Sequence, residues 1–86
     1  MRVVIPSPLF SYTSGQREVD ARGTCVGDVL RDLDAHYPGM RHRIIDEQDR
    51  VRPHIRLFVN GEAASSLRQP LADSDELVIV AALSGG

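Results

Sequence analysis

The sequence contains no lysine, a single cysteine and no long hydrophobic run. All ten basic residues are arginines, so no lysine amine on this chain can accept an isopeptide bond. Because Cys25 is alone, an intramolecular disulfide framework is excluded and a reducing compartment is favoured. The opening MRVVIPSPL is too short an apolar run for a signal peptide, and no later stretch approaches the roughly 20 apolar residues of a membrane span. We therefore expect a cytoplasmic protein with no membrane partner.

The charge pattern excludes a second class of partner. The 12 acidic and 10 basic residues give a net charge of −2 and are mixed along the chain, with no basic stripe that could follow a phosphate backbone. Nucleic acid is therefore not an expected partner. With 42% hydrophobic and 26% charged residues, the 86-residue chain is predicted to form one domain over residues 1–86, with one core.

Two short strands are predicted near the N-terminus. Residues 2–5 are mainly β-branched and are followed by Pro6 and Pro8, which cannot continue a ladder. Residues 17–21 alternate polar and apolar side chains, which places Val19 and Ala21 on one face. Together the two segments predict an opening hairpin.

The clearest helix follows Thr24, where apolar residues recur at helical spacing and aspartates and arginines occupy the other face. Thr24 is the predicted N-cap, Asp28 lies near the positive end of the helix dipole, and Pro38-Gly39 ends the helix. The apolar positions are Val26, Val29, Leu30, Leu33 and Tyr37.

A second helical turn is predicted over residues 40–47, with Ile44 and Ile45 directed inward. The charged residues from Asp46 to Arg52 then form a loop.

The C-terminal half is predicted to contribute a hairpin and a final strand. Residues 54–59 alternate, and Asn60-Gly61 tolerates the positive φ of a type I′ turn. Residues 76–82, ELVIVAA, are nearly all apolar, as in a central strand covered on part of both faces. Alternation in this strand places Leu77 and Ile79 under the helix and Val80 on the opposite face.

The order of elements predicts an α+β fold. A first and a last strand that run parallel at the centre of a mixed sheet, with one main helix across one face, form a ubiquitin-like β-grasp. Other small α+β topologies share this order of elements.

The chain ends in Leu83-Ser84-Gly85-Gly86 directly after the final strand. Because glycine lacks Cβ, a tail ending in two glycines can pass through a narrow channel that a side chain would block. Such an end suits activation of the terminal carboxylate, which must come within reach of the α-phosphorus of ATP. A frayed chain end or an expression remnant also accounts for a terminal Gly-Gly.

Four segments together resemble the sulfur-carrier family that includes the small subunit of molybdopterin synthase, the thiamin-pathway carrier and the carrier of cysteine biosynthesis. These segments are residues 24–30 (TCVGDVL), 55–61 (IRLFVNG), 70–80 (PLADSDELVIV) and Gly85-Gly86. The opening RVVIPSPL and the segment DAHYPGMRHRIIDE are most similar to the cysteine-biosynthesis type.

Two positions depart from the family pattern. Ser74 stands where a glycine is common, and Ala81-Ala82 replace a proline-containing approach to the tail.

The resemblance implies that the chain is not an enzyme but a protein co-substrate. An E1-like adenylating enzyme would use ATP to activate Gly86, and a sulfur donor would convert it to a thiocarboxylate that serves a sulfur-acceptor biosynthetic enzyme. No phosphate-binding glycine loop is present, so we expect no bound cofactor and expect ATP to be held by the partner. Residues 83–86 would enter the partner's active site, with Val80 and Leu83 as an apolar anchor beside the tail.

Other chemistry receives little support from the sequence. Cys25, His36, His42 and His54 lack zinc-ligand spacing, so structural or surface roles are favoured over metal binding, and no metal is expected. The acidic clusters at 46–49 and 73–76 are interpreted as solvated loops, with steering of a basic partner as the alternative. Two other functions remain: a modifier conjugated to proteins through Gly86, and a binding domain whose tail carries no chemistry.

Overall fold

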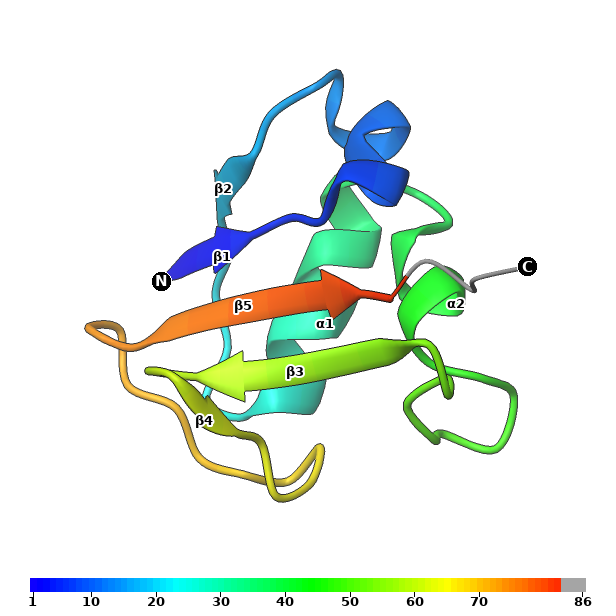
Figure 1. The fold of residues 1–86 in the computed structure, drawn as a ribbon. Helices are drawn as coiled ribbons and strands as arrows, with labels where there is room; N and C mark the ends of the chain where they lie inside the picture. Colours follow the sequence, from blue (N-terminus) through cyan, green and yellow to red (C-terminus); the bar gives the residue numbers. More distant parts are fainter. Residues whose placement is uncertain (83–86) are drawn as a thin grey trace.

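The computed structural model describes residues 1–82, which form a five-stranded mixed sheet with a helix across one face (Figure 1). The strand order is β2-β1-β5-β3-β4, in which β1 and β5 are parallel and the other neighbours are antiparallel. The predicted β-grasp is therefore confirmed. The strands are β1 (Arg2–Val4), β2 (Glu18–Asp20), β3 (Ile55–Val59), β4 (Glu62–Ala63) and β5 (Glu76–Ala81).

The core lies between the sheet and helix α1 (Val26–His36), which crosses behind β5 and β3 in Figure 1. Leu77 and Ile79 of β5 are 0% and 1% exposed on this side. Val80 is 40% exposed on the other face of the same strand. The predicted alternation is thus confirmed, and β5 separates a buried face from an open face.

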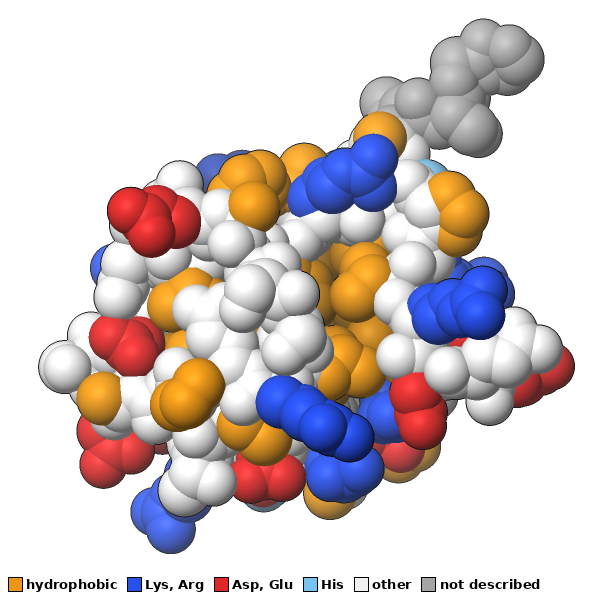
Figure 2. Space-filling view, turned by 90° about the horizontal axis from the view of Figure 1, so that it is seen from below, with side chains coloured by type: hydrophobic (Ala, Val, Ile, Leu, Met, Phe, Trp, Pro, Cys, Tyr) orange, Lys and Arg blue, Asp and Glu red, His pale blue; other side chains and the backbone are white. Residues whose placement is uncertain are grey.

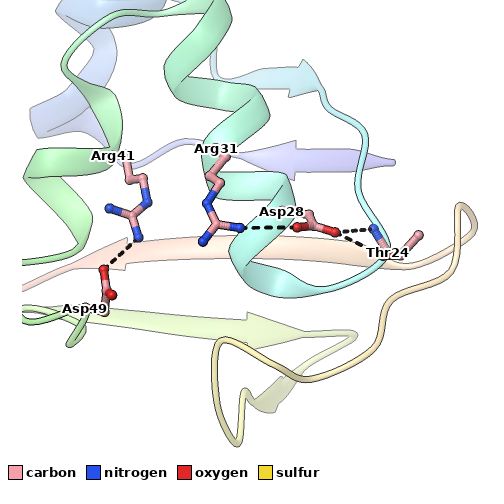
Figure 3. Close-up of polar contacts among 5 residues, drawn as sticks. All are labelled: Thr24, Asp28, Arg31, Arg41 and Asp49. Atoms are coloured by element: carbon pink, nitrogen blue, oxygen red, sulfur yellow. Dashed lines mark hydrogen bonds and ion pairs between the residues drawn. The ribbon is translucent and has the colours of Figure 1, made fainter.

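The start of α1 differs from the prediction. The N-cap is Cys25, not Thr24, and its side chain makes no capping hydrogen bond. Instead, the Asp28 carboxylate reaches back and accepts hydrogen bonds from the Thr24 hydroxyl (3.0 Å) and backbone N–H (3.4 Å), as Figure 3 shows. The first helical N–H groups, those of Val26 and Gly27, donate to carbonyls of the loop before β5. A tertiary contact has therefore replaced the local cap.

The helix ends as predicted. α1 stops at His36, and Gly39 has a φ of 95°, in the region that favours glycine. α2 (Met40–Ile44) follows directly, and both Ile44 and Ile45 are buried. The predicted second helical turn is confirmed, but it ends at Ile44 and not at residue 47, because Ile45 is already extended.

A 3₁₀ helix, η1 (Ser7–Thr13), connects β1 to β2 and was not predicted. The two strands are antiparallel as expected, so the hairpin prediction is correct in pairing but not in its connection. Pro8 lies in the first turn of η1, where its missing N–H costs nothing. The buried Thr13 hydroxyl donates to the Gln16 carbonyl at 2.8 Å and closes the segment.

The predicted turn at Asn60-Gly61 joins β3 to β4, with φ of 51° and 86°. Asn60 also ties this turn to the start of β5. Its backbone N–H donates to the Glu76 carbonyl, its side-chain oxygen accepts from the Glu76 N–H, and its side-chain nitrogen donates to Asp75. The first residue of β5 is thus fixed from the neighbouring strand.

Replacing Leu77 with Ala is expected to lower the free energy of unfolding by about 2–5 kcal/mol, because a fully buried leucine leaves a cavity. Val80→Ala on the open face of the same strand is the matched control, with an expected loss of about 1 kcal/mol or less. Urea denaturation measures both. Equal losses would contradict the assignment of the two faces.

Asp28 is expected to make the stability depend on pH. Hydrogen bonds from Thr24 hold the pKa of Asp28 below its ordinary value of 3.8. A carboxyl group with a lowered folded-state pKa contributes stability above the unfolded pKa and loses it as the pH falls through the folded value. Asp28→Asn should therefore destabilise the protein at pH 7, and its difference from the unchanged protein should shrink below about pH 4.

The control for this titration is Asp73→Asn, because the Asp73 side chain makes no hydrogen bond or ion pair among residues 1–82. Urea unfolding of the three proteins between neutral and acid pH measures the effect. A difference for Asp28→Asn that stays constant across this range would show that its carboxylate charge does not stabilise α1.

Candidate functional site

The candidate site lies where the chain leaves β5. Ala81 is the last residue of the strand, and the N–H of Ala82 donates to the His54 carbonyl at 2.8 Å. The ladder between β3 and β5 therefore continues to the last described residue. The predicted tail residues Leu83, Ser84, Gly85 and Gly86 lie outside the described residues.

An apolar row crosses the open face of the sheet beside this exit. Val78 is paired with Val4 of β1 on one side and with Phe58 of β3 on the other, so the three side chains lie side by side on the same face. Each is partly exposed. Val80, one step closer to the exit, continues the apolar surface, as the sequence predicted. Its role in partner binding stays a prediction.

Charged residues border this row at both ends of β5. Arg2 pairs with Glu18 and Glu76 at the start of the strand. Arg56 lies opposite Val80 in the β3–β5 register and donates to the carbonyls of Pro53 (2.7 Å) and Ile55 (2.9 Å). An apolar strip with a charged border is typical of a surface that binds a protein.

Basic side chains surround the exit itself. His42, Arg43, Arg52 and His54 line a hollow of about 200 Å³ beside it. The Arg43 Nε donates to the Tyr12 hydroxyl at 2.8 Å, and the Arg52 Nε donates to the His42 carbonyl at 2.7 Å. This cluster is not evident in the sequence, because its members come from α2 and from the segment before β3, which only the fold brings together.

The residues considered for metal binding are not brought together. His36 ends α1, His42 lies in α2, His54 precedes β3, and Cys25 is the residue before α1. Among residues 1–82, no three His, Cys, Asp or Glu side chains form a group that could hold a metal ion. Cys25 is half-buried and forms an isolated bridge with Pro70, which supports the structural role favoured by the sequence.

An apolar hollow of about 250 Å³ opens at the edge of β3, on the side seen in Figure 2, where apolar side chains form its floor and arginines stand around it. Its lining includes Val51, Leu57, Phe58 and Leu67 but no acidic residue, histidine or cysteine. No motif or spacing in the sequence indicates this hollow. With no titratable group other than Arg56, the hollow offers shape but no acid–base chemistry.

Two further arginines, one on each helix, are each directed toward a carboxylate in Figure 3. Arg41 pairs with Asp49 at 3.0 Å, and Arg31 pairs with Asp28 at 3.5 Å. These side chains are held by carboxylates of the same chain.

In the part of the chain from residue 1 to residue 82, no helix has the length and apolar character needed to cross a bilayer.

Comparisons with known proteins agree on one family. The profile of the ThiS family matches residues 3–86. The sulfur carrier protein CysO of Mycobacterium tuberculosis is 35% identical over 98% of this chain and 96% of its own length. Small archaeal modifier protein 3 of Haloferax volcanii is 34% identical over 90% of this chain and 89% of its own.

Solved structures show the same relationship. CysO in the Amycolatopsis orientalis BexX/CysO complex superposes with a TM-score of 0.90 at 30% identity, covering 99% of this chain and 98% of that one. Mycobacterium tuberculosis CysO superposes with a TM-score of 0.89 at 32% identity, covering 95% and 98%. Because the family profile matches through the last residue and the fold agrees with the solved CysO structures, the chain belongs to the ThiS family of small β-grasp proteins.

Proposed function

We propose that this protein is a sulfur carrier whose Gly86 carboxylate is adenylated by a partner enzyme and converted to a thiocarboxylate. The observation that carries the proposal is the family match through residue 86, which includes the terminal Gly85-Gly86. The carrier supplies the carboxylate and the surface that partners bind, and it does not act as an enzyme. ATP is a substrate of the adenylating partner and not a cofactor of this chain.

The chemistry balances in two steps. A carboxylate oxygen of Gly86 attacks the α-phosphorus of ATP, and pyrophosphate leaves, which gives an acyl adenylate. A sulfur nucleophile, hydrosulfide in the simplest case, then attacks the acyl carbon, and AMP leaves with the oxygen that bound phosphorus. The resulting thiocarboxylate is a nucleophile that an acceptor enzyme uses to form a carbon–sulfur bond.

The geometry of the exit supports this role. β5 is the central strand: β1 pairs with its first three residues, Glu76 to Val78, and its pairing with β3 continues through the Ala82–His54 hydrogen bond. The base of the tail is therefore held by the sheet, while the two terminal glycines add no side-chain bulk. A fixed base and a bare end together suit delivery of a carboxylate into a confined site.

The named relatives support the sulfur-carrier proposal. CysO is described as a sulfur carrier protein, and one solved structure contains CysO in a complex with BexX. By analogy, we propose cysteine or another sulfur-containing product as the destination of the sulfur, and a biosynthetic enzyme as the acceptor. An E1-like enzyme is the proposed adenylating partner.

A modifier function is the second candidate, because two small archaeal modifier proteins are 34% and 36% identical to this chain. Carrier and modifier share the activation step and differ in what attacks the adenylate. Recovery of Gly86 in an isopeptide bond to a lysine of another protein would favour the modifier.

Deleting Gly86 is expected to abolish thiocarboxylate formation, because the terminal carboxylate then lies on Gly85, one residue short of the position that the partner activates. Adding one residue after Gly86 should have the same effect, since it moves the carboxylate by about 3.3–3.6 Å. Gly85→Val keeps the carboxylate but adds a branched side chain, and a severe loss is expected. Intact mass after incubation with the adenylating enzyme, ATP and sulfide shows whether one oxygen has been replaced by sulfur.

Thermal melting of each tail variant is the control, and its midpoint should remain close to that of the unchanged protein. Full sulfur transfer by the Gly86 deletion would overturn the carrier proposal. The remaining explanation would then be a binding domain whose tail carries no chemistry.

Val80→Asp is expected to weaken activation by roughly tenfold or more, because it places a charge in the apolar surface beside the exit. Helix α1 and the core lie on the other side of the sheet from Val80, so the circular-dichroism spectrum should remain that of the folded protein. The rate of AMP formation at subsaturating carrier measures the effect.

Val51→Asp is the matched control, because Val51 is the other large exposed apolar residue of the described chain and lies on a separate loop. It should be activated at close to the normal rate. Equal activation of Val80→Asp and the unchanged protein would place the binding surface elsewhere.

A further inference from the structure

Two adjoining hollows at the end of β5 contain basic residues and no acidic ones. The first is lined by His42, Arg43, Arg52 and His54, which we call the basic rim. The second hollow, of about 270 Å³, is also lined by Arg43 and His54, and its other lining residues include Leu9 and Ala82. The basic rim therefore borders the point at which the tail leaves the sheet.

Contacts within the chain hold three of these residues in place. Arg43 donates from Nε to the Tyr12 hydroxyl, and its guanidinium carbon lies 5.9 Å from the centre of the Tyr12 ring. Arg52 donates to the His42 carbonyl. His54 is fixed through its backbone, since its carbonyl accepts the Ala82 N–H. The guanidinium groups of Arg43 and Arg52 are thus positioned before any partner binds.

The charges of the basic rim are not neutralised within the described chain. The ion pairs among residues 1–82 involve the N-terminus, Arg2, Arg31, His36 and Arg41, and none involves a member of the rim. The protein has 12 acidic against 10 basic residues, yet no acid lines either hollow. A chain with net negative charge therefore presents a positive surface at the base of its tail.

The shortness of the tail brings the basic rim close to any enzyme that binds the terminal carboxylate. Gly86 is four residues beyond Ala82, so its Cα lies within about 14 Å of the Ala82 Cα even in a fully extended chain, with the carboxylate carbon about 1.5 Å farther. An active site that encloses the carboxylate must therefore have its entrance close to the basic rim. This step rests on the proposed function.

We propose that the adenylating enzyme has an acidic surface at the entrance of the channel that receives the tail, and that this surface binds the basic rim. The adenylating step brings a carboxylate of a negatively charged carrier toward the negatively charged phosphates of ATP. A positive rim facing an acidic entrance offsets this repulsion and orients the carrier with its tail foremost. Complementary charge of this kind accelerates association and is weakened by salt.

The test is the rate of AMP formation by the adenylating enzyme with Arg43→Glu, at low and at high ionic strength. We expect kcat/KM to fall roughly tenfold at low salt, mainly through KM, because the association rate carries most of a steering effect. Raising the salt from about 0.02 to 0.4 M should slow the unchanged carrier and leave Arg43→Glu almost unaffected. The two carriers should then converge.

His54→Glu is the second variant, because its side chain makes no hydrogen bond among the described residues and its loss should not disturb η1. It should show the same change in salt dependence. Arg68→Glu is the matched control: Arg68 lies on the loop that leads to the start of β5, away from the exit, and its substitution should change kcat/KM less than twofold.

The outcomes separate this inference from the proposed function. If Arg43→Glu and His54→Glu match the unchanged carrier at low salt while the Gly86 deletion is inactive, the acidic entrance is overturned and the carrier function stands. An equal loss for Arg68→Glu would also overturn it, because the effect would then follow net charge and not position. If the Gly86 deletion is fully active, the proposed function itself fails.

Discussion

The parallel pairing of β1 with β5 at the centre of the sheet is the constraint on which the rest of the structure depends. Two parallel neighbours cannot be joined by a tight turn, so the chain between them must cross a face of the sheet. Here the crossing segment contains α1, whose buried residues cover Leu77 and Ile79. One face of β5 is thereby closed by the protein's own helix, and the other, with Val78 and Val80, stays available to a partner.

Several of these features are predictable from the sequence because their signals are local. Alternation at Ile55 and Leu57 and the unbroken apolar run at the C-terminus identified β3 and β5, and Asn60-Gly61 identified the turn. The 3₁₀ helix was missed although Pro8 occupies a favourable first-turn position, because one proline between two short strands is equally typical of a loop. Ser74 replaces the glycine of the family pattern without a positive φ, so the turn before β5 does not need glycine.

Features that depend on distant contacts could not be predicted in this way. The start of α1 was misassigned because its N–H groups are satisfied by carbonyls of the loop before β5, about 40 residues later in the chain, and not by Thr24. The basic rim could not be predicted for the same reason. His42 and Arg43 are separated from His54 by a charged loop, and only the packing of α2 beside the end of β3 brings them to one place.

The same constraint explains how one small chain can combine a fixed base with a bare terminus. Because β5 is hydrogen-bonded to β3 up to its end, it can fray only beyond its last bond, which here is the bond from Ala82 to His54. His54, which accepts this last bond, is also a member of the basic rim. Docking at the rim fixes the origin of the tail, and four residues of covalent chain then limit where its carboxylate can lie. The sheet therefore fixes where the tail begins, and the two terminal glycines allow its carboxylate to enter a narrow active site.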